Sequence, residues 1–159
     1  MLIKNIIDTD FINYKKPCMT IECPFCNFKC EKECNEAFCQ NSELALAENL
    51  NIDNKTILDY YFSNPITKAL CFQGLEPFDS WEDLYSLIIL FRLHSDDDIV
   101  IYTGYYENEI NDYIMALEDL PNIFIKFGRY IPNQELHYDD ILGVKLASNN
   151  QYCRKISQV

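Results

Sequence analysis

The sequence predicts an α/β fold, namely a small open or half-barrel sheet of about five mostly parallel strands with helices on the outside. Short runs rich in β-branched and aromatic residues alternate with segments in which apolar residues recur at helical spacing. Strands that are separated by helices pair in parallel through right-handed crossovers. The chain has 159 residues, enough for one domain with its own core, so we expect a single domain over residues 1–159.

Five segments have the length and apolar character of buried strands. In chain order they are 18–22, 68–74, 98–104, 122–128 and 141–147. They are too few for a complete eight-stranded barrel, so we expect the sheet to stay open. In open sheets of this kind, ligands bind at the carboxyl ends of the strands.

The segments between these strands have helical patterns. Asn54 and Ser80 are candidate N-caps, because their side chains can accept hydrogen bonds from the first turn of a helix. Behind Ser80, four apolar residues fall on one helical face: Trp81, Leu84, Ile88 and Phe91. A later helix carries Ile110, Ile114 and Leu117 at helical spacing and ends before Pro121.

The charge and the apolar runs exclude several classes of protein. A formal net charge of −12 argues against non-specific binding to nucleic acid, because the phosphates would be repelled. The longest apolar run, residues 84–91, is too short to cross a bilayer, and residues 1–11 lack the apolar core of a signal peptide. We therefore expect no nucleic-acid or membrane partner and a cytoplasmic, reducing location, where cysteines are more often ligands or catalysts than disulfides.

Five of the eight cysteines lie in one loop, residues 23–40, directly after the strand 18–22. They are Cys23, Cys26, Cys30, Cys34 and Cys39. Long loops without an apolar period are often functional in compact domains. The spacing lacks the long spacer of most structural zinc sites, although zinc stays an alternative. Closely spaced thiolates suit an iron–sulfur cluster better, and a four-iron cluster held by three cysteines would leave one iron open.

At these residues the chain resembles the radical S-adenosylmethionine (SAM) superfamily, and within it the activating proteins of anaerobic ribonucleotide reductase. That family places three cysteines after its first strand, spaced by three and then two residues. Cys26 and Cys30 reproduce the first gap, and Phe38-Cys39-Gln40-Asn41 is similar to the end of the motif. Eight residues separate Cys30 from Cys39, so this chain departs from the family at the second gap.

Three further stretches carry the resemblance. The segment Gln73-Gly74-Leu75-Glu76-Pro77 is similar to the Gly-Gly-Glu/Asp-Pro segment of the family, which lies against the methionine amino group of SAM. Residues 100–110 resemble the family's strand, Thr-Gly-Tyr turn and acidic helix start, and residues 122–151 resemble its closing portion.

The resemblance implies a partial radical SAM barrel with two cofactors, a [4Fe–4S] cluster and SAM. The implied cluster ligands are Cys26, Cys30 and Cys39, with Cys34 or Cys23 as alternative ligands. The implied SAM-binding residues are Gly74, Leu75, Glu76, Pro77 and Thr103. No catalytic residue beyond the cluster ligands is implied.

The implied activity is that of a radical SAM oxidoreductase that activates a glycyl radical enzyme. One electron from the reduced cluster breaks a carbon–sulfur bond of SAM and gives methionine and a 5′-deoxyadenosyl radical. In the family this radical takes a hydrogen atom from a glycine of a partner enzyme such as anaerobic ribonucleotide reductase. The electron donor would be a protein such as flavodoxin or ferredoxin. Two alternatives stay open: a non-catalytic zinc or iron–sulfur binding module, and a radical SAM enzyme that acts on a small molecule.

The other polar and sulfur-containing residues that stand out have ordinary structural explanations. Core or spare thiols are expected at Cys18, Cys71 and Cys153. Surface positions are expected for His94 and His137. Lys126 and Arg129 are cations near the end of the strand 122–128. We expect them either at the surface or facing a carboxylate or phosphate.

Overall fold

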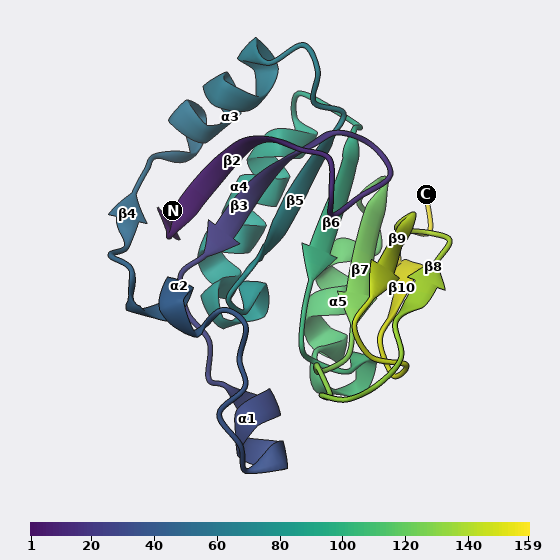
Figure 1. Ribbon diagram of the computed structural model, residues 1–159. Coiled ribbons are helices and arrows are strands. Elements are labelled where there is room, and N and C mark those ends of the chain that lie inside the picture. The colour runs from purple at the N-terminus through teal and green to yellow at the C-terminus, as the bar shows by residue number, and fades with distance from the viewer.

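The computed structural model describes all 159 residues and contains an open six-stranded sheet (Figure 1). From one edge to the other its strands are β10 (Tyr152–Lys155), β7 (Ile123–Phe127), β6 (Asp98–Tyr102), β5 (Ala69–Gly74), β3 (Cys18–Cys23) and β2 (Asn5–Asp10). The four inner strands run parallel, and the two edge strands pair antiparallel with them. The carboxyl ends of the parallel strands therefore meet at one end of the sheet.

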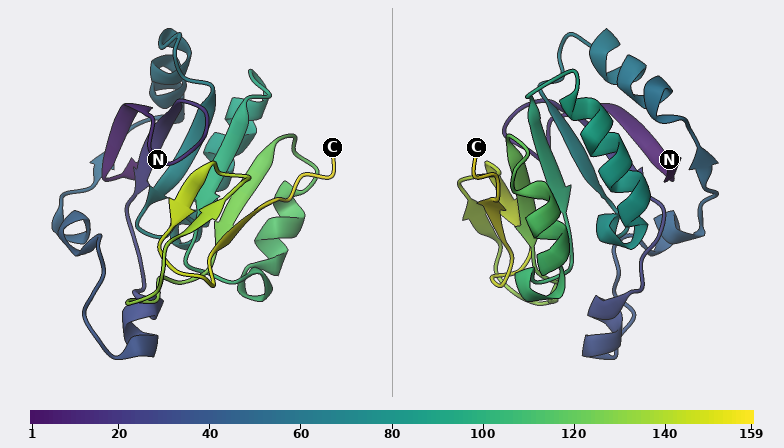
Figure 2. Two further views of the ribbon diagram at one scale, coloured as in Figure 1. Left: turned by 45° about the vertical axis from the view of Figure 1, so that its right-hand side comes forward. Right: turned by 180° about the vertical axis from the view of Figure 1, so that it is seen from behind.

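Five α-helices accompany the sheet: α1 (Lys29–Cys34), α2 (Ser42–Leu46), α3 (Asn54–Ser63), α4 (Trp81–Arg92) and α5 (Asn111–Leu117). Both α4 and α5 cover the same face of the sheet, as the view from behind shows (Figure 2). The short helix α1 lies within the cysteine-rich segment, residues 23–40, and α2 directly follows that segment; both helices lie beyond the carboxyl ends of the parallel strands (Figure 1). That segment is therefore not entirely a loop, because residues 29–34 form the helix α1.

Four short strands form two small antiparallel ladders outside the main sheet. They are β1 (Leu2–Ile3) with β4 (Leu50–Asn51), and β8 (His137–Asp139) with β9 (Val144–Leu146). The β8–β9 hairpin lies on the sheet face opposite α4 and α5 (Figure 2). Both faces of the sheet are thus covered.

Side-chain alternation along the parallel strands separates the two faces. The odd-numbered residues of β3, such as Met19 and Ile21, join the main apolar core with the helices. The even-numbered Cys18 belongs to a smaller cluster on the other face, which Leu142 and Leu146 help to close. Cys71 and Cys153 lie in this same buried cluster, which confirms that all three outlying cysteines are core thiols.

The structure has parallel strands at four of the five expected places. The fifth segment, 141–147, is not a strand of the main sheet, because β9 pairs only with β8. The free edge of β7 is taken by β10, which the sequence patterns did not predict. Gly143, with a φ of 75°, lies in the turn that leads into β9.

One of the two predicted helix caps is wrong and the other is unused. Asp53, rather than Asn54, caps α3: its carboxylate accepts a hydrogen bond of 3.0 Å from the backbone N–H of Thr56. Ser80 does precede α4, but its side chain makes no capping hydrogen bond.

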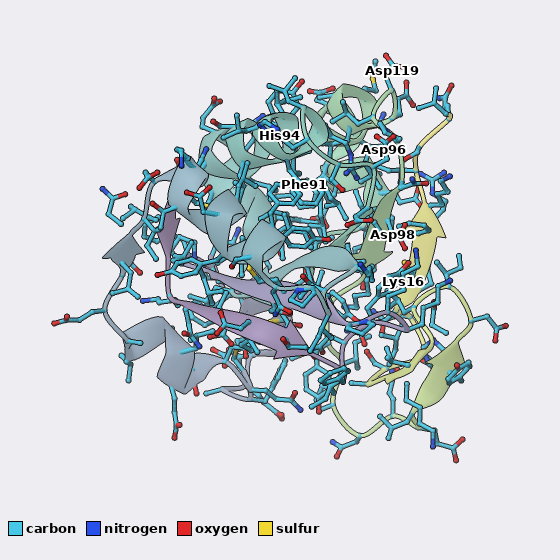
Figure 3. The ribbon with its side chains drawn as sticks, turned by 90° about the horizontal axis from the view of Figure 1, so that it is seen from above. Lys16, Phe91, His94, Asp96, Asp98 and Asp119 are labelled. Atoms are coloured by element: carbon cyan, nitrogen blue, oxygen red, sulfur yellow. The ribbon has the colours of Figure 1, made fainter.

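The amino ends of the parallel strands lie at the opposite end of the molecule from α1. In Figure 3, which looks onto this end, Lys16 and Asp98 lie next to each other, and their Nζ and Oδ2 atoms are 2.5 Å apart. Tyr14 donates a hydrogen bond of 2.8 Å to the same carboxylate. His94 is exposed near this end, as expected, whereas His137 is half-buried in β8 rather than at the surface. None of the helices has both the length and the apolar character needed to span a membrane.

Candidate metal centre

A cavity of about 470 Å³ lies at the carboxyl ends of the parallel strands. All four of these strands, or the turns that follow them, contribute to its wall, together with the cysteine-rich segment and β9. Ligands of open α/β sheets bind at this end because the strand ends leave a crevice there.

The sheet face that the β8–β9 hairpin covers gives the cavity a polar floor. Its four members come one from each parallel strand: Glu22, Gln73, Tyr102 and Lys126. Glu22 pairs in register with Gln73, and Tyr102 with Lys126. The last pair between β5 and β6 is Phe72 with Ile101. The next residues, Gln73 and Tyr102, therefore lie at the same level, and the four side chains form one row across the sheet.

Three of the five cysteines of the loop line this cavity: Cys26, Cys30 and Cys39. Cys23 is fully buried in the main core, and Cys34 is exposed at the end of α1, so neither alternative ligand lines the cavity. In this structure no three His, Cys, Asp or Glu side chains are close enough to share a metal ion. Three thiols in one cavity wall suit an iron–sulfur cluster, whose usual ligands are thiolates, and they would have to converge as it binds.

Burial controls the protonation of these thiols. It raises the pKa of Cys26 to about 11, and it also raises the pKa of Cys30, to which the neighbouring Cys39 contributes. Thiols with raised pKa values are protonated near neutral pH. Because a metal centre binds thiolates, its binding should release protons from these two partly buried cysteines.

A triangle of hydrogen bonds fixes the residue after Cys26 to the body of the domain. The backbone N–H of Asn27 donates to Asp79 at 3.0 Å, and its side-chain amide donates to the hydroxyl of Tyr105 at 2.7 Å. Tyr105 in turn donates to Asp79 at 2.6 Å. The first cysteine of the cavity is therefore held by groups from the turns that follow β5 and β6.

A second polar network ties α1 to the turn after β7. Arg129 is 5% exposed and donates two hydrogen bonds of 2.6 Å to the carboxylate of Glu109. Its Nε lies 2.9 Å from a carboxylate oxygen of Glu33, and Lys29 bonds to Glu109 at 3.0 Å. Hydrogen bonding to Arg129 lowers the pKa of Glu109 to about 2. The carboxylate expected near Arg129 is thus supplied by the chain itself.

Glu76 is a buried carboxylate in the cavity wall. Its oxygens accept hydrogen bonds from the hydroxyl of Thr103 at 2.7 Å and from the backbone N–H groups of Gly104 at 2.9 Å and Phe78 at 3.1 Å. Burial raises its pKa to about 7, and these three hydrogen bonds oppose that rise. A carboxylate has about four acceptor positions, so one stays free for a ligand.

Gly74 is the residue at which the backbone turns into this site. Its φ is +87°, and a Cβ atom there would lie 3.2 Å from the Cα of Glu22 and 3.0 Å from a methyl group of Leu44. The side-chain amide of Asn41 donates a hydrogen bond of 2.5 Å to the Gly74 carbonyl oxygen. The segment that carries Cys39 is thereby joined to the turn after β5.

Of the five residues expected to bind SAM, four line the cavity: Gly74, Leu75, Glu76 and Thr103. Pro77 does not line it, because it is buried as the first residue of the 3₁₀ helix Pro77–Ser80. Its fixed φ suits the first position of a helix.

Lys126 is the buried cation of the site. It is 7% exposed, and its ammonium group donates hydrogen bonds to the carbonyl oxygens of Gly128 at 2.9 Å and Thr103 at 3.5 Å. Burial lowers its pKa to about 8. It therefore faces the cavity and is not a surface residue.

The family of the chain agrees with this geometry. Residues 19–152 match the model of a family described as the 4Fe-4S single cluster domain. The chain belongs to this family. The matched range begins in β3 and reaches β10, so it includes every strand that contributes to the cavity floor. Comparison with curated proteins and with solved structures finds no match.

The family is an iron–sulfur domain associated with radical SAM proteins. Membership supports the expected [4Fe–4S] cluster and argues against the zinc alternative. Together with the position of the cysteines, it makes this chain a domain that binds a [4Fe–4S] cluster.

The floor residues Glu22, Gln73 and Tyr102 were not among the residues predicted from the sequence. A signal for them exists. Each is the last polar or hydroxyl-bearing residue of a mostly apolar strand, and alternation places it on the sheet face that carries Cys18 and Cys71. Lys126 interrupts the apolar run of β7 in the same way.

Proposed function

We propose that this chain is a radical SAM enzyme that cleaves SAM reductively, and that it activates a glycyl radical enzyme. One observation carries the proposal. Cys26, Cys30 and Cys39 line the same cavity as Gly74, Glu76 and Thr103, although these residues come from three separate parts of the chain. Shared family membership with iron–sulfur domains of radical SAM proteins supports the same conclusion.

In this proposal the cysteines hold the cluster through three thiolates, so that one iron stays free for SAM. When bound and reduced by an external donor, the cluster would supply the electron for the cleavage of SAM to methionine and a 5′-deoxyadenosyl radical. The free acceptor position of Glu76 binds the ammonium group of SAM. The turn at Gly74 allows the backbone to approach the ligand closely, because any side chain there would meet Glu22.

The remaining wall of the cavity has the groups needed to orient the rest of a ligand. Lys126 offers its third ammonium proton to an anionic group, since two are directed to carbonyl oxygens. Phe38 and Tyr130 line the cavity and contact each other edge to face, with ring centroids 5.5 Å apart. Such a pair excludes water from a bound ligand.

The spectrum of the reconstituted protein tests whether an iron is open to SAM. The chain is loaded anaerobically with iron and sulfide and reduced with dithionite, and electron paramagnetic resonance spectra are recorded with and without SAM. A cluster with an open iron changes its spectrum when SAM binds. A cluster with four protein ligands, as in a domain that only transfers electrons, gives the same spectrum in both samples, and that result would contradict the proposal.

The activase part of the proposal is tested with a candidate glycyl radical enzyme and a flavodoxin or ferredoxin as electron donor. We expect a protein-based radical signal on the partner that depends on SAM and on this chain. A second candidate function is a radical SAM enzyme that acts on a small molecule, and the polar floor of Glu22, Gln73, Tyr102 and Lys126 favours it. Consumption of SAM without any radical on the partner would support this second function.

A further inference from the structure

The side chain of Glu31 connects the two ends of the eight-residue segment that separates Cys30 from Cys39. The carboxylate oxygen Oε1 of Glu31 accepts hydrogen bonds from the backbone N–H groups of Phe38, at 3.0 Å, and of Cys39, at 2.6 Å. Glu31 directly follows Cys30, so this carboxylate links the second cavity cysteine to the third. Hydrogen bonds from backbone N–H groups to a carboxylate are stronger than those between neutral groups.

The backbone of the segment folds back so that this contact can form. The helix α1 is flanked by Phe28 and Asn35, which both have left-handed backbone conformations with φ of 54°. The carbonyl oxygen of Glu31 accepts a hydrogen bond of 3.3 Å from the N–H of Glu36. Glu31 thus receives hydrogen bonds from the returning segment through both its backbone and its side chain.

The apolar core does not hold this segment in place. No residue of α1 is buried, and residues 32–37 are all exposed. Cys39 itself is only half-buried. Polar contacts therefore fix the position of Cys39: its own N–H donates to Glu31, and Asn41, two residues further on, donates to the Gly74 carbonyl oxygen.

We propose that Glu31 is the positioning residue that brings Cys39 to the metal centre and so makes up for the long second gap. This inference rests on the proposed function, because it takes Cys39 as a cluster ligand. Glu31 does not contact the cluster in this account; it acts through the backbone of Cys39.

Iron retention by the whole chain provides the test, without any measurement of activity. The anaerobically reconstituted protein is mixed with an iron chelator, and the rate of iron loss is followed by absorbance. The variants are Glu31→Ala, Glu31→Gln, Cys39→Ala and the double variant of Glu31→Ala with Cys39→Ala. Glu36→Ala is the matched control, because its side chain is exposed in the same segment and makes no hydrogen bond or ion pair.

Loss of a group that orients a metal ligand lowers metal affinity by about 10- to 100-fold, so Glu31→Ala should lose iron faster by a factor in this range. Glu31→Gln should fall between Glu31→Ala and the natural protein, because its amide oxygen still accepts a hydrogen bond. Glu36→Ala should behave like the natural protein. The thermal midpoint of metal-free Glu31→Ala should be unchanged, since α1 buries no residue. In the Cys39→Ala background, Glu31→Ala should add little further loss.

Two results would overturn the inference alone: iron retention by Glu31→Ala equal to that of the natural protein, or an equal effect of Glu31→Ala with and without Cys39. Unchanged iron retention by Cys39→Ala would overturn the ligand assignment of the proposed function and the inference with it. The Cys39→Ala variant therefore separates the two failures.

Discussion

The hydroxyl group of Thr103, just beyond the end of β6, donates a hydrogen bond of 2.7 Å to the carboxylate of Glu76, just beyond the end of β5. The same hydroxyl oxygen accepts a hydrogen bond of 2.9 Å from the backbone N–H of Tyr105. Thr103 therefore has its donor committed to Glu76, and its main contribution to a ligand is to keep that carboxylate ionised and in place.

The first prediction concerns the replacement of Thr103. Thr103→Val removes one of three donors to the Glu76 carboxylate, so the pKa of Glu76 should rise and its ionised fraction at pH 7 should fall. We expect the affinity for SAM at pH 7 to fall about tenfold, the usual effect of losing a hydrogen bond to a charged group. Anaerobic calorimetric titration measures this. Thr103→Ser should restore binding, and equal affinities of the valine and serine variants would contradict the account.

The second prediction is a pH dependence of SAM binding. Burial places the pKa of Glu76 at about 7, above its usual 4.5, so the carboxyl group is neutral below about pH 7. If the ionised form binds the ammonium group, affinity should weaken by about tenfold for each pH unit below the pKa. The same titration between pH 6 and pH 8 measures this slope. Glu76→Gln should bind weakly and without this slope, and an unchanged slope would assign the titration to another group.

The third prediction compares two glycines of the cavity wall. Gly74→Ala should destabilise the protein by about 1–3 kcal/mol, because alanine is strained at a φ of +87° and its Cβ would press on the backbone of Glu22. Gly104→Ala is the matched control: its Cβ would meet only an oxygen of Glu76, at an ordinary 3.6 Å. Urea unfolding of the metal-free proteins measures both free energies. Equal losses at the two sites would show that Gly74 has no special conformational role.

The fourth prediction concerns Lys126 and the free energy of unfolding. Its pKa is about 8 in the folded protein, below the 10.5 of an exposed lysine. Between these values the unfolded chain binds more protons, so this group makes stability rise as the pH increases from about 8 towards 10.5. Urea unfolding of the reduced protein at pH 7.5 and pH 9.5 should show a larger gain in the natural protein than in Lys126→Met. The same gain in both proteins would mean that Lys126 is not desolvated.

The sequence was informative where strand patterns and strand ends decide the structure. The apolar runs that became β3, β5, β6 and β7 are short and bounded by turn residues, and their parallel order follows from the helices between them. Because parallel strand ends meet at one end of the sheet, the sequence alone is enough to expect Cys26 and Glu76 near each other. Both line one cavity in the folded chain.

The sequence was less informative where a contact between distant residues decides the structure. Nothing in the local pattern of 141–147 shows that β10 takes the edge of β7 and leaves β9 to pair with β8. The sequence also does not show whether Cys39 lies near Cys30, because the distance between the two cysteines depends on how the intervening segment folds. In the folded chain the carboxylate of Glu31 accepts a hydrogen bond from the backbone N–H of Cys39, and the spacing of the cysteines does not reveal this contact.

Radical SAM activity is tested by the formation of 5′-deoxyadenosine from SAM by the reconstituted, dithionite-reduced chain. We expect product from the natural protein and from Cys34→Ala, whose thiol is exposed and does not line the cavity. We expect no product above background from Cys26→Ala, Cys30→Ala or Cys39→Ala. Failure of the natural protein to form 5′-deoxyadenosine, or formation of equal amounts by the Cys30→Ala variant, would contradict the proposed function.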